Sequence, residues 1–412
     1  MSSTKKHFPI FLVLMVLPAL QACRSGFDAD FTGEGLRIDY YAAGDRGGER
    51  AEFVCAARTP LWSGPRTGLV PGGDDAVLPG DYRIVMLDAE SGDTLYVNGF
   101  NTLFGEWRTT AQALQEEQKY YSSNTVPMPR RKCTVNIECR DRHTMLFGPT
   151  GSFAIDPAAV PECGLPANEV QEVQICGEPS RKVDLTFLAE GYTAAEREKF
   201  ASDVRRFTEA LFGCPPFSSR REDFNVRAVY LESKESGAGG LVTKDTALGA
   251  NYWTFGTDRY LTISDMKPVA DAVWDVPTDA VFVLVNEEVY GGGGIYNFYA
   301  TGSSDNPRTL SVFLHEFGHS FGALADEYFD SETGYDQDAF YVLSQEPWEP
   351  NITTLKREKW QSWHNGLHEG GGYREKGIWR PEDHCMMRDY APFCPVCSKA
   401  IEERIDYYTS SL

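Results

Sequence analysis

His315-Glu316-Phe317-Gly318-His319 is the stretch that decides the fold and the chemistry of this 412-residue chain. It lies within residues 310–324, where apolar residues recur at helical spacing, so we expect one helix to carry both histidines. Residues four apart lie on one face of a helix, and two neutral imidazoles at that spacing can share a zinc ion. Glu316 would stand beside them and take a proton from a water molecule that the metal activates. The stretch therefore predicts a zinc-dependent hydrolytic site.

A zinc site needs a third protein ligand, and the residues after the helix offer two carboxylates. We expect the helix to end at Gly322, which can adopt a positive φ and let the chain turn back towards the metal. Asp326 is the predicted third ligand, and Glu327 is the alternative. The opposite, apolar face of the helix would be buried and hold the ligands in place. Its residues are Phe313, Leu314, Phe317 and Phe321.

Two other segments are expected near the metal, one to bind the substrate and one to support the site. The glycines at 291–294 lead into a predicted strand, residues 295–300, whose exposed edge could pair with an extended peptide. Further along, His384-Cys385-Met386-Met387-Arg388 could form a turn that places a methionine beneath the metal. Tyr373 and Tyr390 flank this turn and are candidates for stabilising the oxyanion formed at a scissile carbonyl.

The second half of the chain alternates strands and helices. Continuous apolar runs predict strands at 183–188, 225–231 and 280–285. Thr193-Ala194-Ala195-Glu196 is a capping box, which predicts a helix as far as about Phe212, ended by Gly213. This order predicts an α/β domain over residues 181–412.

Residues 24–160 show a different pattern. Short alternating runs, separated by Gly, Asp and Pro, predict strands at 36–41, 52–56, 82–87, 94–97 and 133–139. Strands of this length and spacing suggest an all-β sandwich domain without a catalytic constellation. A run rich in Pro, Ala and Glu follows, and we place a linker at residues 161–180.

The first 23 residues resemble an export signal. Lys5 and Lys6 precede an apolar run, residues 8–20, which is too short to span a bilayer. The run ends in Leu20-Gln21-Ala22-Cys23, which resembles the lipobox of bacterial lipoproteins. By that resemblance, Cys23 becomes a diacylated N-terminal residue that anchors the exported protein to the cell envelope, at the outer membrane or the cell surface. An ordinary secretory signal is the alternative, and export is expected in both cases.

The charge of the chain argues against one class of partner. With a formal net charge of −21, the chain lacks the clustered Lys and Arg that phosphate binding requires, so no nucleic-acid partner is expected.

Export would place the nine cysteines that follow Cys23 where disulfides can form. Because nine is odd, at least one stays free or pairs between chains. Cys394-Pro395-Val396-Cys397 is compatible with half of a structural zinc site completed by His384 and Cys385, or with a redox motif. A disulfide or buried thiols are favoured, because no second Cys-x-x-Cys completes a zinc ribbon.

Three segments together resemble one protein family. They are His-Glu-Phe-Gly-His-Ser-Phe-Gly-Ala-Leu-Ala-Asp-Glu-Tyr at 315–328, Asp-Phe-Asn-Val at 223–226, and the tail that runs from Trp-Arg-Pro at 379–381 through Cys-Met-Met at 385–387 to Phe-Cys-Pro-Val-Cys at 393–397. In these segments the chain is similar to the IgA peptidase family of bacterial zinc metallopeptidases. The likeness covers most of the chain, including a β domain ahead of the catalytic one.

The resemblance implies a metzincin-like catalytic domain that binds Zn²⁺ through His315 and His319, with Glu316 as general base and Met387 in a Met-turn. The sequence departs from the metzincin pattern at the third ligand. That position is Ala325, which cannot bind zinc, and the carboxylate of Asp326 comes one residue later. The resemblance does not imply a preference for the IgA hinge.

The expected protein is a secreted, lipid-anchored zinc metalloendopeptidase that hydrolyses protein or peptide substrates bound as extended strands. One alternative is a surface lipoprotein that binds host protein or glycan and has an inactive peptidase scaffold. The presence of Glu316 between both histidines argues against it. The other alternative is a zinc hydrolase acting on a non-peptide amide or ester, which a deep, closed pocket would favour.

Overall fold

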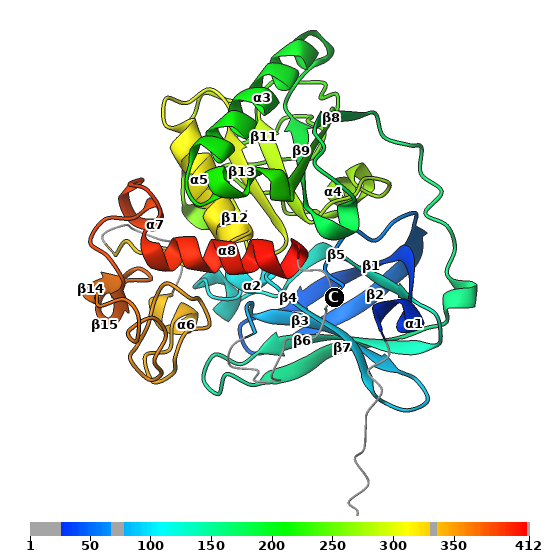
Figure 1. Cartoon of the computed structure of the whole chain (residues 1–412), viewed down its shortest axis with the longest axis horizontal. Coiled ribbons are helices and arrows are strands. Elements are labelled where there is room, and N and C mark those ends of the chain that lie inside the picture. The colour runs from blue at the N-terminus through cyan, green and yellow to red at the C-terminus, as the bar shows by residue number, and fades with distance from the viewer. Residues whose placement is uncertain (1–25, 67–77, 330–335, 410–412) are drawn as a thin grey trace, which may run out of the picture.

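The computed structural model describes residues 26–66, 78–329 and 336–409 (Figure 1). The predicted signal peptide and Cys23 lie outside these residues. Within the described ranges, no helix is long and apolar enough to cross a membrane.

The first part of the chain consists of two antiparallel sheets with the orders β2-β1-β5 and β4-β3-β6-β7. Leu36 and Ile38 of one sheet share a buried core with Ile84 and Met86 of the other. The predicted β region ahead of an α/β domain is confirmed, although β5 and β7 were not among the predicted strands. The elements are α1 (Phe27–Asp30), β1 (Phe31–Gly44), β2 (Glu49–Thr59), β3 (Tyr82–Asp88), β4 (Thr94–Phe100), α2 (Leu103–Trp107), β5 (Gln118–Pro129), β6 (Cys133–Arg140) and β7 (Phe147–Ile155).

The second part is organised around a six-stranded sheet with the order β12-β13-β11-β9-β10-β8. Its four central strands run parallel, whereas the edge strands β12 and β8 are antiparallel to their neighbours. β8 lies inside the predicted linker, so part of that segment belongs to the sheet. The strands are β8 (Val170–Gln174), β9 (Val183–Glu190), β10 (Phe224–Val229), β11 (Ala280–Val285), β12 (Gly292–Ile295) and β13 (Tyr299–Ser303).

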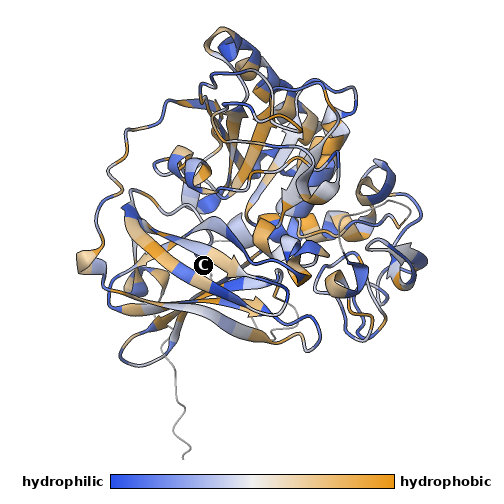
Figure 2. Cartoon of the chain, turned by 180° about the vertical axis from the view of Figure 1, so that it is seen from behind, coloured by the Kyte–Doolittle hydropathy of each residue, from blue (hydrophilic) through white to orange (hydrophobic). Residues whose placement is uncertain are grey.

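The central strands are continuous apolar runs because both faces of the sheet are covered. Every residue of β9 is buried. Leu185 and Phe187 face a core formed with α3 (Arg197–Gly213), α5 (Thr309–Ser320) and α8 (Pro395–Thr409). Leu188 faces the opposite core, to which α4 (Lys267–Ala272) contributes Val269. The hydrophobic strands of this sheet are visible between the helices in Figure 2.

The capping box predicted before α3 is present. Thr193 and Glu196 form reciprocal hydrogen bonds around a short 3₁₀ turn, Ala194–Glu196, which leads directly into the helix. The predicted end at Gly213 also agrees with the structure.

The helix that carries the histidines ends earlier than predicted. α5 stops at Ser320, and the left-handed residue that reverses the chain is Ala323 (φ 60°), not Gly322. The Leu324 amide then donates to the Gly318 carbonyl, which satisfies a carbonyl in the last turn of the helix. Gly322 is required for a different reason, because a Cβ there would lie 2.7 Å from that carbonyl oxygen.

The strand predicted at residues 295–300 is wrong. The glycine-rich segment itself forms edge strand β12, and the chain turns at residues 296–298 before returning as β13. Glycines are needed in β12 because the strand lies against α5. A Cβ at Gly294 would lie only 2.3 Å from the Glu316 carbonyl oxygen.

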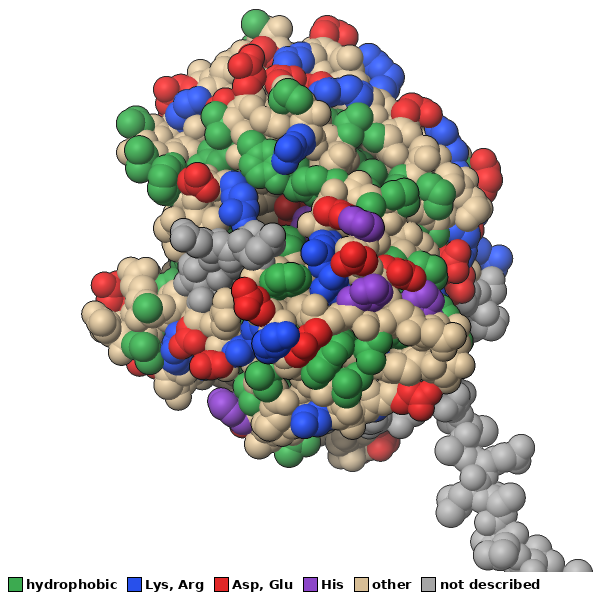
Figure 3. All heavy atoms as spheres, turned by 90° about the vertical axis from the view of Figure 1, so that its left-hand side faces the viewer, with side chains coloured by type: hydrophobic (Ala, Val, Ile, Leu, Met, Phe, Trp, Pro, Cys, Tyr) green, Lys and Arg blue, Asp and Glu red, His purple; other side chains and the backbone are tan. Residues whose placement is uncertain are grey.

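The remaining small elements form one side of the molecule (Figure 1). They are α6 (Gln337–Phe340), the hairpin β14 (His368–Gly371) and β15 (Arg374–Arg380), and α7 (Met386–Asp389). Figure 3 views the molecule from this side, where charged groups of both signs are intermixed and the surface is hollowed between the upper and lower parts of the chain.

Candidate active site

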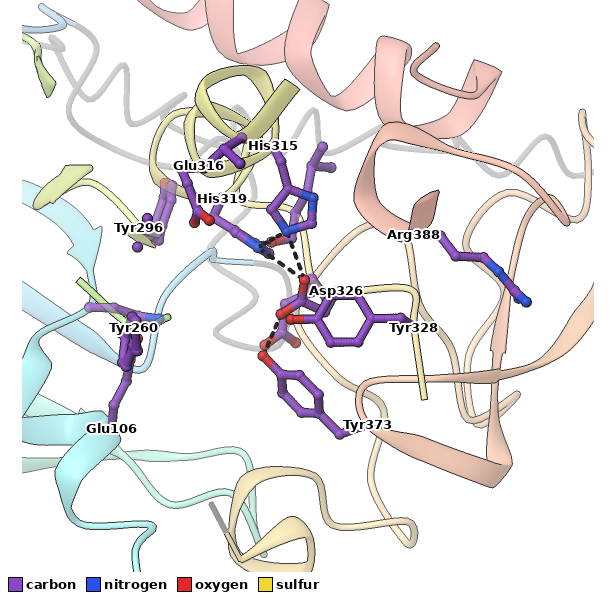
Figure 4. Close-up of a pocket in the computed structure, with 18 of the residues that line it drawn as sticks. Glu106, Tyr260, Tyr296, His315, Glu316, His319, Asp326, Tyr328, Tyr373 and Arg388 are labelled. Atoms are coloured by element: carbon purple, nitrogen blue, oxygen red, sulfur yellow. Dashed lines mark hydrogen bonds and ion pairs between the residues drawn. The ribbon is translucent and has the colours of Figure 1, made fainter. Parts of the chain in front are cut away.

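His315 and His319 project from one face of α5, and the chain beyond the helix brings Asp326 back to them (Figure 4). Nε2 of His315 lies 3.1 Å from Nε2 of His319 and 3.0 Å from Oδ1 of Asp326. Nε2 of His319 lies 3.2 Å from the same oxygen. Three donor atoms from two segments of the chain therefore converge on one point.

These separations fit a shared metal ion. In a tetrahedral zinc site with ligand bonds of about 2.0–2.1 Å, the ligand atoms lie about 3.3 Å apart. Two imidazole nitrogens and a carboxylate oxygen are also ligands that zinc accepts. Three is also the number of ligands that a catalytic zinc site takes from the protein, which leaves the fourth position for water or substrate.

The other nitrogen of each imidazole is fixed by the backbone. Nδ1 of His315 lies 2.9 Å from the Met386 carbonyl oxygen, and Nδ1 of His319 lies 2.6 Å from the Leu324 carbonyl oxygen. A protonated Nδ1 donates to each carbonyl and leaves Nε2 as the free lone pair. Such contacts set the tautomer and ring orientation that metal-binding histidines need.

The electrostatics of the three groups also favour a shared cation. Burial opposes protonation of His319, but the Asp326 carboxylate outweighs it and raises the pKa of His319 to about 9. Burial likewise opposes ionisation of Asp326, but the two imidazoles hold the pKa of Asp326 well below its usual range. The carboxylate is therefore ionised and requires positive charge beside it.

Glu316 lies on α5 beside the two histidines and faces the cavity (Figure 4). Burial raises the pKa of Glu316, and the neighbouring imidazoles counteract part of this effect. The side chain lies against β12, where a Cβ at Gly292 would be 3.0 Å from Oε1. Glycine at this position therefore leaves the carboxylate room to reach a reacting group.

Met387 lies beneath the helix that carries the histidines. It is fully buried, and a Cβ at Gly318 would lie 2.7 Å from its sulfur. The Met387 carbonyl oxygen accepts a hydrogen bond from the Glu327 amide at 2.8 Å. The preceding residue, Met386, supplies the carbonyl that orients His315. The turn thus supports the site from below, where the sequence placed Met387.

The two candidate tyrosines take different positions. The Tyr373 hydroxyl donates a short hydrogen bond to Oδ2 of Asp326, so its contact is with the predicted ligand. The Tyr390 ring lies 5.6 Å from the His315 ring, and its hydroxyl shares a hydrogen bond with that of Tyr290. Of the two, Tyr390 has the position that better suits a group acting on substrate.

Two further groups that line the same cavity were not predicted from the sequence. The Tyr328 ring stacks over His315 at 6.3 Å, and its hydroxyl interacts with the Arg259 guanidinium. Tyr328 comes two residues after Asp326, so its place near the histidines could have been predicted from the sequence. Arg259 lies in an irregular stretch without a motif, so nothing in the sequence signals its role.

The cavity has a volume of about 380 Å³ and is bounded by the edge strand β12. The outer edge of β12 is partly occupied, because Gly292 exchanges hydrogen bonds with Arg259 and Leu261. At the other end, the Tyr296 carbonyl accepts from the Asn101 amide. Since alternate residues of a strand bond to the same side, Gly294 faces outward between these contacts. The edge available to a peptide is shorter than the predicted strand implied.

Glu327, the alternative ligand, does not reach the histidines. Its side chain is fully buried beside three cysteines, Cys385, Cys394 and Cys397. No disulfide forms among the nine cysteines of the described residues. His384 is exposed and pairs with Asp389, so it does not complete a site with Cys385.

Comparison with known protein families shows the family of the chain. The model of IgA Peptidase M64 matches residues 171–367 and 364–405, and the model of the Peptidase M64 N-terminus matches residues 26–147. The chain belongs to the peptidase M64 family. As an M64 peptidase, it acts on protein or peptide substrates. The M64 N-terminus corresponds to the β-rich first part, and the peptidase match begins within β8 and includes the whole histidine segment. No match to this M64 peptidase was found among curated proteins.

Proposed function

We propose that the chain is a zinc-dependent, metzincin-like metalloendopeptidase in which His315, His319 and Asp326 hold the metal. The observation that carries the proposal is the convergence of the three donor atoms at 3.0–3.2 Å, with Glu316 beside them. The departure from the metzincin pattern at Ala325 is consistent with this assignment, because the turn at Ala323 directs the next carboxylate to the histidines.

Zn²⁺ at this position would lower the pKa of a water molecule and polarise the scissile carbonyl. Glu316 is the general base that accepts the proton of the attacking water and delivers it to the leaving amine. The Met386 and Leu324 carbonyls hold the imidazoles in the required orientation. Hydroxyl and guanidinium groups of Tyr390 and Arg259, which line the cavity, stabilise negative charge on the carbonyl oxygen.

The substrate binds as a short extended strand. Gly294 on the outer edge of β12 pairs with the peptide backbone, and the occupied edge on both sides of it limits the length of that pairing. Side chains of the substrate then decide specificity through the walls of the cavity. Endopeptidase action fits a cavity that is open to the surface rather than sealed.

Export and anchoring belong to the same proposal. The segment Leu20-Gln21-Ala22-Cys23 supports a lipid on Cys23 that holds the protein on the cell envelope, at the outer membrane or the cell surface. In cells fed a labelled fatty acid, the native chain should carry label and sediment with membranes. A Cys23→Ser variant should lose the label, and a Cys214→Ser variant should retain it. Label retained by Cys23→Ser would refute the anchor without touching the peptidase assignment.

The peptidase proposal is tested by mass spectrometry of peptides released from a mixture of proteins. The native chain should release peptides, removal of metal with a chelator should stop release, and added zinc should restore it. Glu316→Gln should retain the metal but lower the cleavage rate by about 100- to 10,000-fold. Glu198→Gln is the matched control, because Glu198 is exposed on α3 and distant in sequence from the site.

Equal cleavage by the native chain and Glu316→Gln would exclude Glu316 as the base. If the native chain binds zinc but releases no peptide, while it cleaves small amide or ester substrates, the hydrolase acts on non-peptide bonds. If it cleaves neither, the scaffold serves binding.

A further inference from the structure

A second group of potential metal ligands lies behind the active site. Cys385, Cys394, Cys397 and Glu327 each offer one ligand atom, and these atoms all lie within 4.8 Å of one another. Sγ of Cys385 is 3.7 Å from Sγ of Cys397, which is 3.2 Å from Oε1 of Glu327. In a tetrahedral zinc site with Zn–S bonds of about 2.3 Å, two sulfurs lie about 3.8 Å apart. The cluster has the dimensions of a metal site.

The carboxylate of Glu327 is the unusual member of this cluster. The residue is 0% exposed, and its Oε2 has no hydrogen-bond partner among the described residues. Oε1 accepts from Asn351 at 2.9 Å and faces the Cys397 thiol, but Glu327 takes part in no ion pair among the parts of the chain that the structure describes. Burying an ionised carboxylate costs on the order of several kcal/mol unless a cation lies beside it. A cation among the thiols would do so.

Burial also argues against a redox role for the cysteine pair. A reactive Cys-x-x-Cys motif needs a partly exposed attacking thiol. Here Cys394 is 4% exposed, and Cys385 and Cys397 are 0% exposed. A redox pair would also involve only two cysteines and would not account for the third cysteine or for the buried carboxylate beside them. Three thiolates with a carboxylate are instead a donor set that zinc accepts.

We propose that Cys385, Cys394, Cys397 and Glu327 bind a structural zinc ion, separate from the metal held by the histidines. This ion would join three segments. Glu327 directly follows Asp326, Cys385 directly precedes the residue whose carbonyl orients His315, and Cys394 and Cys397 lie at the start of α8. The second zinc therefore fixes the two chain segments that support the histidine site, and its existence does not depend on that site.

The test is the metal content of the full chain, purified without reductant or chelator. Native protein should contain about two zinc ions per chain, and Cys397→Ser and Glu327→Gln should each contain about one. Cobalt substitution gives a second readout, because thiolates bound to Co²⁺ produce an intense charge-transfer absorption that imidazoles and carboxylates do not. Native protein should show this band, and Cys397→Ser should weaken or lose it. Cys214→Ser is the matched control and should behave as the native chain.

A variant lacking the histidine ligands keeps the test decisive if Cys397→Ser fails to fold. His315→Ala combined with His319→Ala should retain about one zinc and the full cobalt–thiolate band. The proposal is overturned if this double variant binds no metal, or if native protein holds one zinc and mapping finds Cys394 in a disulfide or freely alkylated. Neither result bears on whether the histidine site cleaves peptides.

Discussion

The residues proposed to bind the metal are themselves positioned by hydrogen bonds with their surroundings. Asp326 receives the Tyr373 hydroxyl on the oxygen that does not face the histidines, so the contact orients the carboxylate without competing for the metal. Tyr390 has no such contact with a ligand and instead shares its hydroxyl with Tyr290. Loss of the Tyr373 hydroxyl should therefore affect metal binding, whereas loss of the Tyr390 hydroxyl should affect the rate of cleavage.

Tyr373→Phe should lower zinc affinity by about 10- to 100-fold, because loss of a hydrogen bond to a metal-binding carboxylate weakens the ligand. Tyr390→Phe should leave zinc affinity unchanged and lower kcat by about 100- to 1000-fold if its hydroxyl stabilises the oxyanion. Competition with a chelating dye measures the affinity, and cleavage of a peptide at saturating zinc measures kcat. A loss of affinity in Tyr390→Phe and not in Tyr373→Phe would reverse these assignments.

Among the elements, those built on local signals were predictable from the sequence and those defined by long-range contacts were not. The capping box located the start of α3, and the continuous apolar runs located β9, β10 and β11, because each signal lies within the element itself. β12 was missed because four residues, mostly glycine, have no periodicity, and their strand exists only through pairing with β13 and packing against α5.

The same distinction applies to the candidate site. His315, Glu316 and His319 follow from their spacing, and Asp326 followed from chemistry, since zinc needs a third ligand. Arg259 comes from a loop far away in the sequence, which is held against β12 because the Arg259 carbonyl accepts from the Gly292 amide and the Leu261 amide donates to the Gly292 carbonyl. Glu327, the alternative third ligand, lies instead beside Cys385, Cys394 and Cys397. Adjacent residues of an extended segment point in opposite directions, so Asp326 and Glu327 face different sites.

The capping box should make the stability of the protein depend on pH. Burial opposes ionisation of Glu196, but hydrogen bonds from Thr193, Asn286 and Ser236 outweigh it and lower its pKa from 4.5 to about 2. A carboxyl whose pKa is lower in the folded state contributes stability above the unfolded pKa and loses it as the pH falls towards the folded pKa. Glu196→Gln should therefore cost about 1–2 kcal/mol at pH 7, allowing for solvent screening of a half-buried group.

Urea unfolding of the native chain and of Glu196→Gln between pH 7 and pH 3 checks this expectation. The difference between the two should narrow as the pH falls below about 4.5 and Glu196 becomes protonated in the unfolded state. Glu198→Gln, at an exposed position of the same helix, should remain close to the native chain throughout. A difference that stays constant with pH would assign the effect to packing rather than to charge.

A substitution at the contact between β12 and α5 should also lower the stability of the protein. Gly294→Ala places a Cβ 2.3 Å from the Glu316 carbonyl oxygen, so the strand must move away from the helix. We expect a loss of about 1–3 kcal/mol in the free energy of unfolding, together with reduced cleavage because the substrate edge is displaced. Gly213→Ala is the control, since a Cβ there meets no atom within 4 Å. Full activity in Gly294→Ala would show that substrate does not depend on this edge.

At the scale of the whole molecule, the β domain is part of the active-site wall rather than an attachment to it. Asn101 and Glu106 line the same cavity as the histidines, and the Asn101 amide holds the Tyr296 carbonyl at the end of β12. Figure 4 places Glu106 and Tyr260 together on the side of the cavity opposite Asp326 and Tyr373. The cavity that holds the candidate site is therefore bounded by both parts of the chain.

Arg142 is one of the residues that join the two parts of the chain. It follows β6 and forms ion pairs with Asp81 of its own domain at 2.6 Å and with Glu349 of the peptidase part at 3.2 Å. Its guanidinium also lies 5.4 Å from the ring centroid of Tyr341. The Glu349 side chain is only 4% exposed, so removing the guanidinium takes away one of the two cations that act on a nearly buried carboxylate, the other being Lys359.

Arg142→Met should therefore lower the free energy of unfolding by about 2–4 kcal/mol. This loss is smaller than that for breaking a fully buried ion pair, because the Arg142 side chain keeps some contact with solvent. Differential scanning calorimetry should show the single transition of the native chain separating into two, as the β domain and the peptidase domain unfold independently. Arg66→Met removes an exposed ion pair with Asp28 and should change neither quantity appreciably. If Arg142→Met still unfolds in one transition but loses activity, the ion pairs shape the cavity wall without coupling the stability of the two domains.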